Sequence, residues 1–201
     1  MKKTLIAAAL AVTSLSACAP AVEVVDTSHD RGEAVVGLDY RDFQSAASSL
    51  VQSLLASGAA DNPKGGRYVL TITKVANKTM QRIDTDDLTR VIRDELRNSG
   101  KVATTTAISV NGPEDASTAK LRELRGNAMI KQSTVKADGQ VIAPDLSLTA
   151  KIVQNNVAMP SGKTQVEYTF DVVLTDINTG LEIWGDRRKI IKRSSQSTVT
   201  W

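Results

Sequence analysis

Apolar and polar residues alternate over two stretches in the C-terminal third of the chain. The apolar positions are Leu146, Leu148, Ala150 and Ile152 in the first stretch, and Val166, Tyr168, Phe170, Val172 and Leu174 in the second. A period of two predicts β-strands that bury one face and leave the other to water or to a partner. Residues 176–180 end in Gly180 and predict a hairpin turn, so residues 181–193 are expected to return antiparallel.

Two earlier segments repeat apolar residues at helical spacing. The first is expected to begin at Asp39 and to end at Gly58, and its apolar positions are Phe43, Ala46, Ala47, Leu50, Val51 and Leu54. The second begins at Asp84, whose carboxylate can accept from free N–H groups, and ends at Ser99-Gly100. Its apolar positions are Leu88, Val91, Ile92 and Leu96.

The remaining elements are weaker in pattern. A third helix is expected from Pro113 to Arg125. Residues 67–75 and 101–110 are rich in β-branched side chains and predict two more strands, while residues 77–79 predict a polar turn. The fold class is therefore α+β: a mostly antiparallel sheet of four to five strands, with helices packed on one face, in a single domain.

The N-terminus has the layout of a secretory signal. Lys2 and Lys3 precede an apolar run over residues 5–12, which is too short to span a bilayer. Small residues follow, and residues 15–18, Leu-Ser-Ala-Cys, resemble a bacterial lipobox, in which the cysteine is acylated and the chain is cut just before it. Cys18 is therefore the predicted lipid attachment site. The alternative is a soluble secreted protein whose cysteine stands there by chance.

These features predict three segments: a lipoprotein signal peptide at 1–17, the lipidated cysteine with a flexible tether at 18–38, and an α+β domain at 39–201. Ala19 follows the cysteine instead of an aspartate, which in bacterial sorting favours the outer membrane, with the domain expected to face the periplasm. A tether of some 20 residues reaches about 70 Å when fully extended and about 25 Å as a flexible coil.

Composition excludes several function classes. Loss of Lys2 and Lys3 with the signal peptide lowers the formal net charge from +3 to +1, so the charge of the whole chain says little about partners. Aromatic residues make up only 3% of the chain, so the core is expected to be aliphatic. Once Cys18 is acylated, no thiol remains for a disulfide or a metal site.

Chemistry-bearing constellations are missing from the sequence. The single histidine, His29, falls in the predicted tether, so no catalytic triad and no zinc site can be assembled. Asp84, Asp86 and Asp87 suggest a cation site, but they also stand where a helix N-terminus favours negative charge. Residues 64–67 lack the Gly-Lys-Ser/Thr ending of a phosphate loop. We therefore expect a protein that is not an enzyme, with no cofactor and no metal apart from the covalent lipid.

The largest charge cluster lies near the C-terminus and comprises Arg187, Arg188, Lys189, Lys192 and Arg193. One interpretation is the exposed edge of the last strand, where charges prevent edge-to-edge aggregation. The other is a positive patch for an acidic protein or an anionic envelope polymer, with Arg187, Arg188 and Lys192 as the partner-binding residues. Nucleic acid is excluded by the expected compartment. Trp184 is expected to anchor the core.

Several segments resemble one known family. They are Asn77-Lys78-Thr79, the helix start at 83–85, residues 96–101 (Leu-Arg-Asn-Ser-Gly-Lys), and residues 172–184, whose ending Thr-Gly-Leu-Glu-Ile-Trp is the most specific part. Over residues 67–193 the chain is similar to the LpoB family of outer-membrane lipoproteins. The resemblance implies an antiparallel sheet flanked by helices. It also implies a non-catalytic role: binding and activating a bifunctional penicillin-binding protein, the peptidoglycan synthase of the inner membrane.

Two other function classes stay open at this stage. Related folds occur in lipoproteins that assemble into envelope complexes, including curli-type secretion pores and flagellar accessory proteins, so a structural or secretion component is the main alternative. A pore subunit would need spare strand pairs of about 9–11 residues with lipid-facing apolar side chains. A small-ligand or glycan-binding lipoprotein is the third possibility, since an exposed sheet face can bind glycans without a sequence motif.

Overall fold

The computed structural model describes residues 26–27, 32, 35–108, 115–135, 137 and 139–194. The elements, in chain order, are α1 (Tyr40–Ser57), β1 (Tyr68–Ile72), β2 (Ala76–Lys78), α2 (Thr85–Asn98), β3 (Val102–Thr104), α3 (Ala116–Glu123), a 3-10 turn (Gln132–Thr134), β4 (Leu146–Ala158), β5 (Thr164–Asp176) and β6 (Glu182–Arg193). They belong to one compact unit that begins at Val35.

The six strands form one mixed sheet with the order β3-β1-β4-β5-β6, and β2 pairs with β4 alongside that path. The α+β class and the helices on one face are confirmed, but the expected mostly antiparallel sheet of four to five strands is wrong. The pairs β1–β3, β1–β4 and β2–β4 are parallel, whereas β4–β5 and β5–β6 are antiparallel. The connection from β1 to β3 contains α2, and a helical crossover of this kind joins parallel strands.

Two local predictions are corrected as well. Residues 77–79 were expected to be a polar turn, yet Asn77 and Lys78 belong to β2 and pair with Ile152 and Val153 of β4. Of the strand expected over 101–110, the described residues 101–108 contain only Val102–Thr104, and residues 109–110 lie outside the described part of the chain. Both segments contribute only three residues to the sheet, and three residues are too few to show the apolar–polar alternation that identifies a strand.

Local capping signals set the ends of both long helices. Asp39 accepts hydrogen bonds from the backbone of α1's first turn, and Gly58 closes the helix with φ 76°. Asp84 accepts from the backbone N–H of Asp86, and Gly100 follows α2 with φ 72°. A left-handed φ suits glycine because a Cβ would be strained there. The predicted boundaries of these two helices are confirmed.

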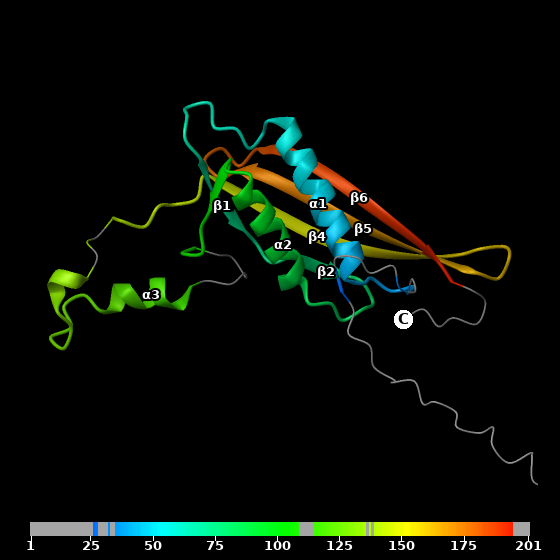
Figure 1. The fold of residues 1–201 in the computed structure, drawn as a ribbon, viewed down its shortest axis with the longest axis horizontal. Helices are drawn as coiled ribbons and strands as arrows, with labels where there is room; N and C mark the ends of the chain where they lie inside the picture. The colour runs from blue at the N-terminus through cyan, green and yellow to red at the C-terminus, as the bar shows by residue number, and fades with distance from the viewer. Residues whose placement is uncertain are drawn as a thin grey trace, which may run out of the picture. The chain divides into compact units, whose positions relative to one another are not determined.

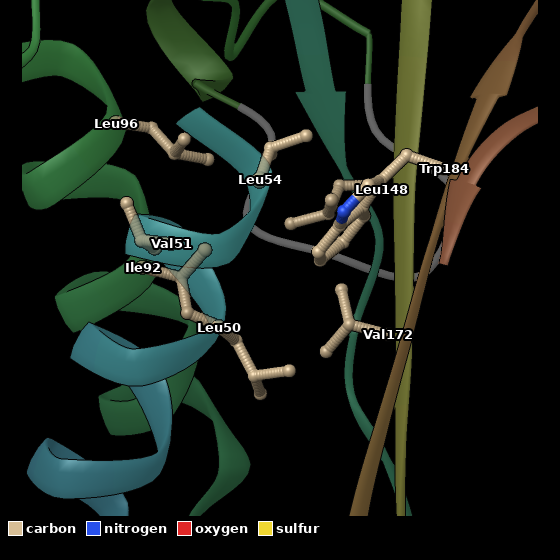
Figure 2. A pocket seen from close by; sticks show the side chains of 8 residues that line it. All are labelled: Leu50, Val51, Leu54, Ile92, Leu96, Leu148, Val172 and Trp184. Atoms are coloured by element: carbon tan, nitrogen blue, oxygen red, sulfur yellow. The ribbon is translucent and has the colours of Figure 1, made fainter. Parts of the chain in front are cut away.

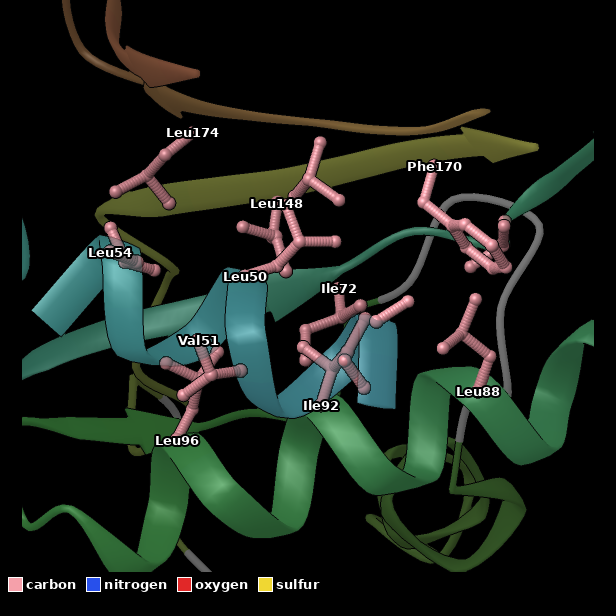
Figure 3. Close-up of a cluster of buried hydrophobic side chains, with 14 of the residues drawn as sticks. Leu50, Val51, Leu54, Ile72, Leu88, Ile92, Leu96, Leu148, Phe170 and Leu174 are labelled. Carbon is pink, nitrogen blue, oxygen red and sulfur yellow. The ribbon is translucent and has the colours of Figure 1, made fainter. Parts of the chain in front are cut away.

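The core lies between the two long helices and one face of the sheet (Figure 1). Figure 3 shows Leu50, Val51 and Leu54 of α1 and Leu88, Ile92 and Leu96 of α2 directed toward strand residues such as Leu148, Phe170 and Leu174. Along β5 every second side chain is buried, so the apolar positions that alternate in the sequence are the ones that face the core. Phe43 meets Phe170 edge-on, with ring centroids 6.0 Å apart.

The segment that leads into α1 is fastened to the sheet and to the loop before α2; we call it the entry segment, residues 36–39. Its hydrogen bonds run from the Tyr168 hydroxyl to the Val36 carbonyl (3.4 Å), from Lys192 Nζ to the Gly37 carbonyl (2.7 Å) and from the Leu38 N–H to Gln81 Oε1 (2.9 Å). Lys192, with a side chain only 14% exposed, also lies 2.5 Å from Asp42 and 3.9 Å from Asp39. Lys192 therefore serves as a structural cation.

The first prediction concerns the core. Leu96 is fully buried, so Leu96→Ala removes apolar contacts and leaves a void, and we expect the free energy of unfolding to fall by about 2–5 kcal/mol. Leu181 is 63% exposed, so Leu181→Ala is the matched control and should change it by less than about 0.5 kcal/mol. Urea unfolding measures both. Equal losses in the two variants would contradict the assigned core.

The second prediction concerns Lys192. Lys192→Met leaves the carboxylates of Asp39 and Asp42 without their nearest ammonium group, and we expect a loss of about 2 kcal/mol at pH 7. Lys189→Met, at an exposed ion pair, is the control and should cost less than about 0.5 kcal/mol. Urea unfolding at neutral pH compares the two variants, and a Lys192→Met protein as stable as the control would rule out the structural cation.

The loss should also depend on pH in a defined direction. Burial acts to raise the pKa of Asp39, but hydrogen bonds from Arg41 and Asp42 and the charge of Lys192 outweigh it, so this pKa is lowered overall. A lowered pKa in the folded state gives stability that is present above the unfolded value, about 3.9, and is lost as the pH falls through the folded value. The difference between wild type and Lys192→Met should therefore shrink from pH 7 to pH 3.

Candidate functional site

The structure separates the three predicted partner-binding residues. Successive residues of β6 point to opposite faces of the sheet. Arg188 and Lys192 pair with Phe170 and Val166, which are buried under the helices, so these two lie on the helix side. Arg187 pairs with Asp171 and lies on the other side. The predicted cluster is thus divided between two faces and does not form a single patch.

The helix-side cations already have partners within the domain. Arg188 lies 3.1 Å from Asp186, and Lys192 holds the entry segment. A hydrogen bond from the Ser53 hydroxyl of α1 is the main cause that lowers the pKa of Asp186, and the Arg188 charge adds to it. The charged side chains of β6 on the helix side are therefore paired within the domain. Little unpaired charge is left on this side for a partner.

Trp184 also lies on the helix side and packs against the core, as expected. Figure 2 shows it over a small void with Leu50 and Leu54 of α1, Leu148 of β4 and Val172 of β5. The void holds only about 10 Å³ and is lined mainly by aliphatic side chains, which is at the lower limit of the space that a single water molecule needs. It is a packing imperfection and offers no room for a substrate.

The other side of the sheet carries a different surface, which we call the open face. It is formed by Ala76 and Lys78 of β2, Thr149, Lys151 and Val153 of β4, Glu167, Thr169, Asp171 and Val173 of β5, and Glu182, Gly185, Arg187, Lys189, Ile191 and Arg193 of β6. Among these residues, five side chains are basic and three are acidic, so the open face is positive. None of them is aromatic.

Acidic side chains on β5 organise the cations of the open face. Asp171 lies opposite both Lys151 and Arg187, at 3.3 Å and 3.2 Å, so one carboxylate is shared by two cations across three strands. Next to this row, a hydrogen bond from Lys189 at 3.0 Å is the main cause that lowers the pKa of Glu167. Asp171 and Glu167 are therefore both paired with cations of the domain. The basic side chains of the open face still outnumber its acidic ones.

A shallow hollow lies beside this row. It has a volume of about 250 Å³ and is lined by Ala76, Thr149, Ala150, Lys151, Asp171 and Val173. Gly185 is opposite Val173, which in turn is opposite Thr149, and the Glu182 carboxylate of β6 occupies the space over Gly185 where a Cβ would stand. The lining of the hollow therefore combines one ion pair, Lys151 with Asp171, with small and apolar groups.

Sequence reasoning selected Arg187 and included Lys189 in the charge cluster, but it did not single out Lys151 or Asp171. Strict alternation within 181–193 is enough to separate Arg187 from Arg188 and Lys192. The partnership of Lys151 with Asp171, however, depends on the register of β4 against β5, and composition carries no signal for that register.

The other sequence candidates have simpler outcomes. Asp84 caps α2, and Asp87 lies 3.7 Å from Arg90, in agreement with a helix N-terminus. Over the described residues, no three metal-ligating side chains gather into a possible ion site. Within that same part of the chain, no helix combines the length and apolarity that a membrane span requires. Cys18 and His29 lie outside the described residues.

Among solved structures, the chain is similar to the LpoB C-terminal domain from Salmonella enterica, with 16% identity, a TM-score of 0.46, and coverage of 74% of this chain and 98% of that one. It is also similar to the LpoB C-terminal domain from Escherichia coli, with 18% identity, the same TM-score and the same coverage. The solution structure of E. coli LpoB shares 19% identity at a TM-score of 0.45, over 88% of this chain and 86% of that one.

No curated protein sequence matches the chain. The sequence model of one family, described as peptidoglycan-synthase activator LpoB, matches residues 42–190. This match covers most of the chain and runs from the first turn of α1 into β6. A family of activators is not a family of enzymes, so the expected absence of catalysis agrees with it. The chain therefore belongs to the LpoB family of peptidoglycan-synthase activators.

Proposed function

We propose that this protein is an outer-membrane lipoprotein that binds and activates a bifunctional penicillin-binding protein, and so regulates peptidoglycan synthesis. The family match over residues 42–190 carries the proposal, since it includes both long helices and nearly all of the sheet. The same match does not favour the alternative of a structural or secretion component.

Activation by such a domain is a matter of binding energy. The lipoprotein raises the rate only as far as it binds the active form of the synthase more tightly than the resting form. A tenfold rise corresponds to about 1.4 kcal/mol of difference between the two affinities. One moderate interface supplies that amount, and no catalytic group of the activator is required.

Anchoring follows from the lipobox. We propose that Cys18 carries the lipid and holds the domain at the outer membrane, facing the periplasm. The tether then places the docking region of the synthase within about 70 Å of the anchor. In the flexible state the domain stays on average within about 25 Å, so a synthase domain that projects outward from the inner membrane is the expected docking site.

The third prediction tests activation. Residues 19–201, produced without the lipid, are added to the cognate bifunctional synthase, and glycan polymerisation is followed with time. We expect the rate to rise with dose and to saturate. A monofunctional glycosyltransferase from the same organism is the control and should not respond. A flat dose response of the bifunctional synthase would contradict the proposed function.

The fourth prediction tests the anchor. Radiolabelled palmitate should enter the wild-type protein in growing cells, and Cys18→Ser should abolish the label and move the protein from the membrane fraction to the soluble fraction. Because several buried acyl chains are needed for firm attachment, loss of the thiol should release nearly all of the protein. A substitution at Ser16 such as Ser16→Thr, which keeps the thiol, is the control. Unlabelled wild-type protein would refute lipidation.

A further inference from the structure

We propose that the open face is the surface with which this protein docks an acidic surface of its synthase, and that one side chain of that partner enters the hollow beside Lys151. This inference rests on the proposed function and adds the face of the domain and the chemistry of recognition.

The first step is the surplus of positive charge. Asp171 is shared between Lys151 and Arg187, so two cations have one carboxylate between them. A second carboxylate, supplied from outside, completes this pair. Complementary charge of this kind steers association and fixes the orientation of the complex.

The second step is the shape of the surface next to that row. The hollow of about 250 Å³ has room for one side chain of a partner, which would meet the Lys151–Asp171 ion pair and the small or apolar groups of Ala76, Ala150 and Val173.

The third step is the size of the open face. Strands of 12 to 13 residues extend over roughly 40 Å, and three of them with the adjacent β2 span about 15 Å. The resulting area of about 600 Å² matches one side of a small, transient interface. A regulator that must bind and release its synthase needs an interface of this size.

The last step is the contrast with the helix side. There the cations Arg188 and Lys192 are neutralised by Asp186, Asp39 and Asp42, and the entry segment occupies part of the surface. The open face has no aromatic ring for stacking against sugars, so a protein surface suits it better than a glycan does. The two sides of the sheet thus differ in the role that their charges play.

The experiment measures binding of the full-length chain, in detergent, to the purified cognate synthase by biolayer interferometry, together with glycan polymerisation. Lys151→Glu combined with Arg187→Glu reverses the charge of the shared row. We expect the Kd to rise about 10- to 100-fold and activation to need correspondingly more protein. Arg90→Glu combined with Arg97→Glu on α2 is the matched control, because both arginines are exposed and paired with one aspartate each. Its Kd should change less than about threefold.

Two further variants keep the test decisive if the double reversal does not fold. Lys151→Gln with Arg187→Gln removes the charges without adding carboxylates, and should flatten the rise of Kd between 50 and 300 mM salt. Thr149→Trp fills the hollow and leaves the charge unchanged, and should weaken binding about tenfold. Thermal melting confirms that each protein is folded.

Each outcome has one meaning. Weaker binding by the open-face variants, with the α2 control intact, supports the proposal. Full binding and activation by folded open-face variants overturns it and leaves the activator function standing. A wild-type chain that neither binds nor activates the synthase overturns both. Sedimentation with purified sacculi is run in parallel. If the open-face variants lose binding to sacculi but still bind the synthase, the open face binds the cell-wall polymer, and the protein-docking proposal is overturned.

Discussion

Burial of one side of three long strands is the constraint on which the rest of this structure depends. Along β5 the residues from Val166 to Leu174 alternate between the core and the open face, and α1 and α2 seal the core side. A slip of one residue would turn every apolar side chain of a strand toward water, so packing fixes the register of β4, β5 and β6. The same register decides which charged residues meet on the open face. The core and the candidate interface are therefore set by a single arrangement.

The sequence predicts well those elements whose signals are local. Asp39 and Gly58 mark the ends of α1, and the alternation over 166–174 identifies β5, because capping and period-two burial are both readable within a few residues. The parallel pairing of strands is not readable in this way, although strands were predicted at the positions of β1 and β3. Ala76–Lys78 is exposed and short, and its partner Lys151 is distant in the sequence, so only the assembled sheet shows that it is a strand. For the candidate site, the alternation within β6 is enough to place Arg187 and Lys192 on opposite faces of the sheet. Lys151 and Arg187 come together only because both pair with Asp171 on a third strand.

A regulator of this kind uses charge differently on the two sides of its sheet. Lys192 lies in a nearly enclosed position, where an ammonium group is retained because it holds the start of α1 against β6. Lys151 and Lys189 remain about half exposed, where an ion pair adds little to stability. Such surface pairs are free to exchange one carboxylate for another at low cost. Replacement of Lys192 therefore acts on folding, while replacement of Lys151 acts on recognition.

Under the proposed anchoring at Cys18 the domain would be held by its N-terminal end, and the entry segment then has a mechanical consequence. Tension along the tether arrives first at Val36, Gly37 and Leu38, whose hydrogen bonds lead to β5, to β6 and to the loop before α2. Force is therefore divided among three elements before it reaches the first turn of α1. Because β5 is joined to β6 along 11 residue pairs and to β4 along 13, the load passes into the extensively paired part of the sheet and does not fall on α1 alone.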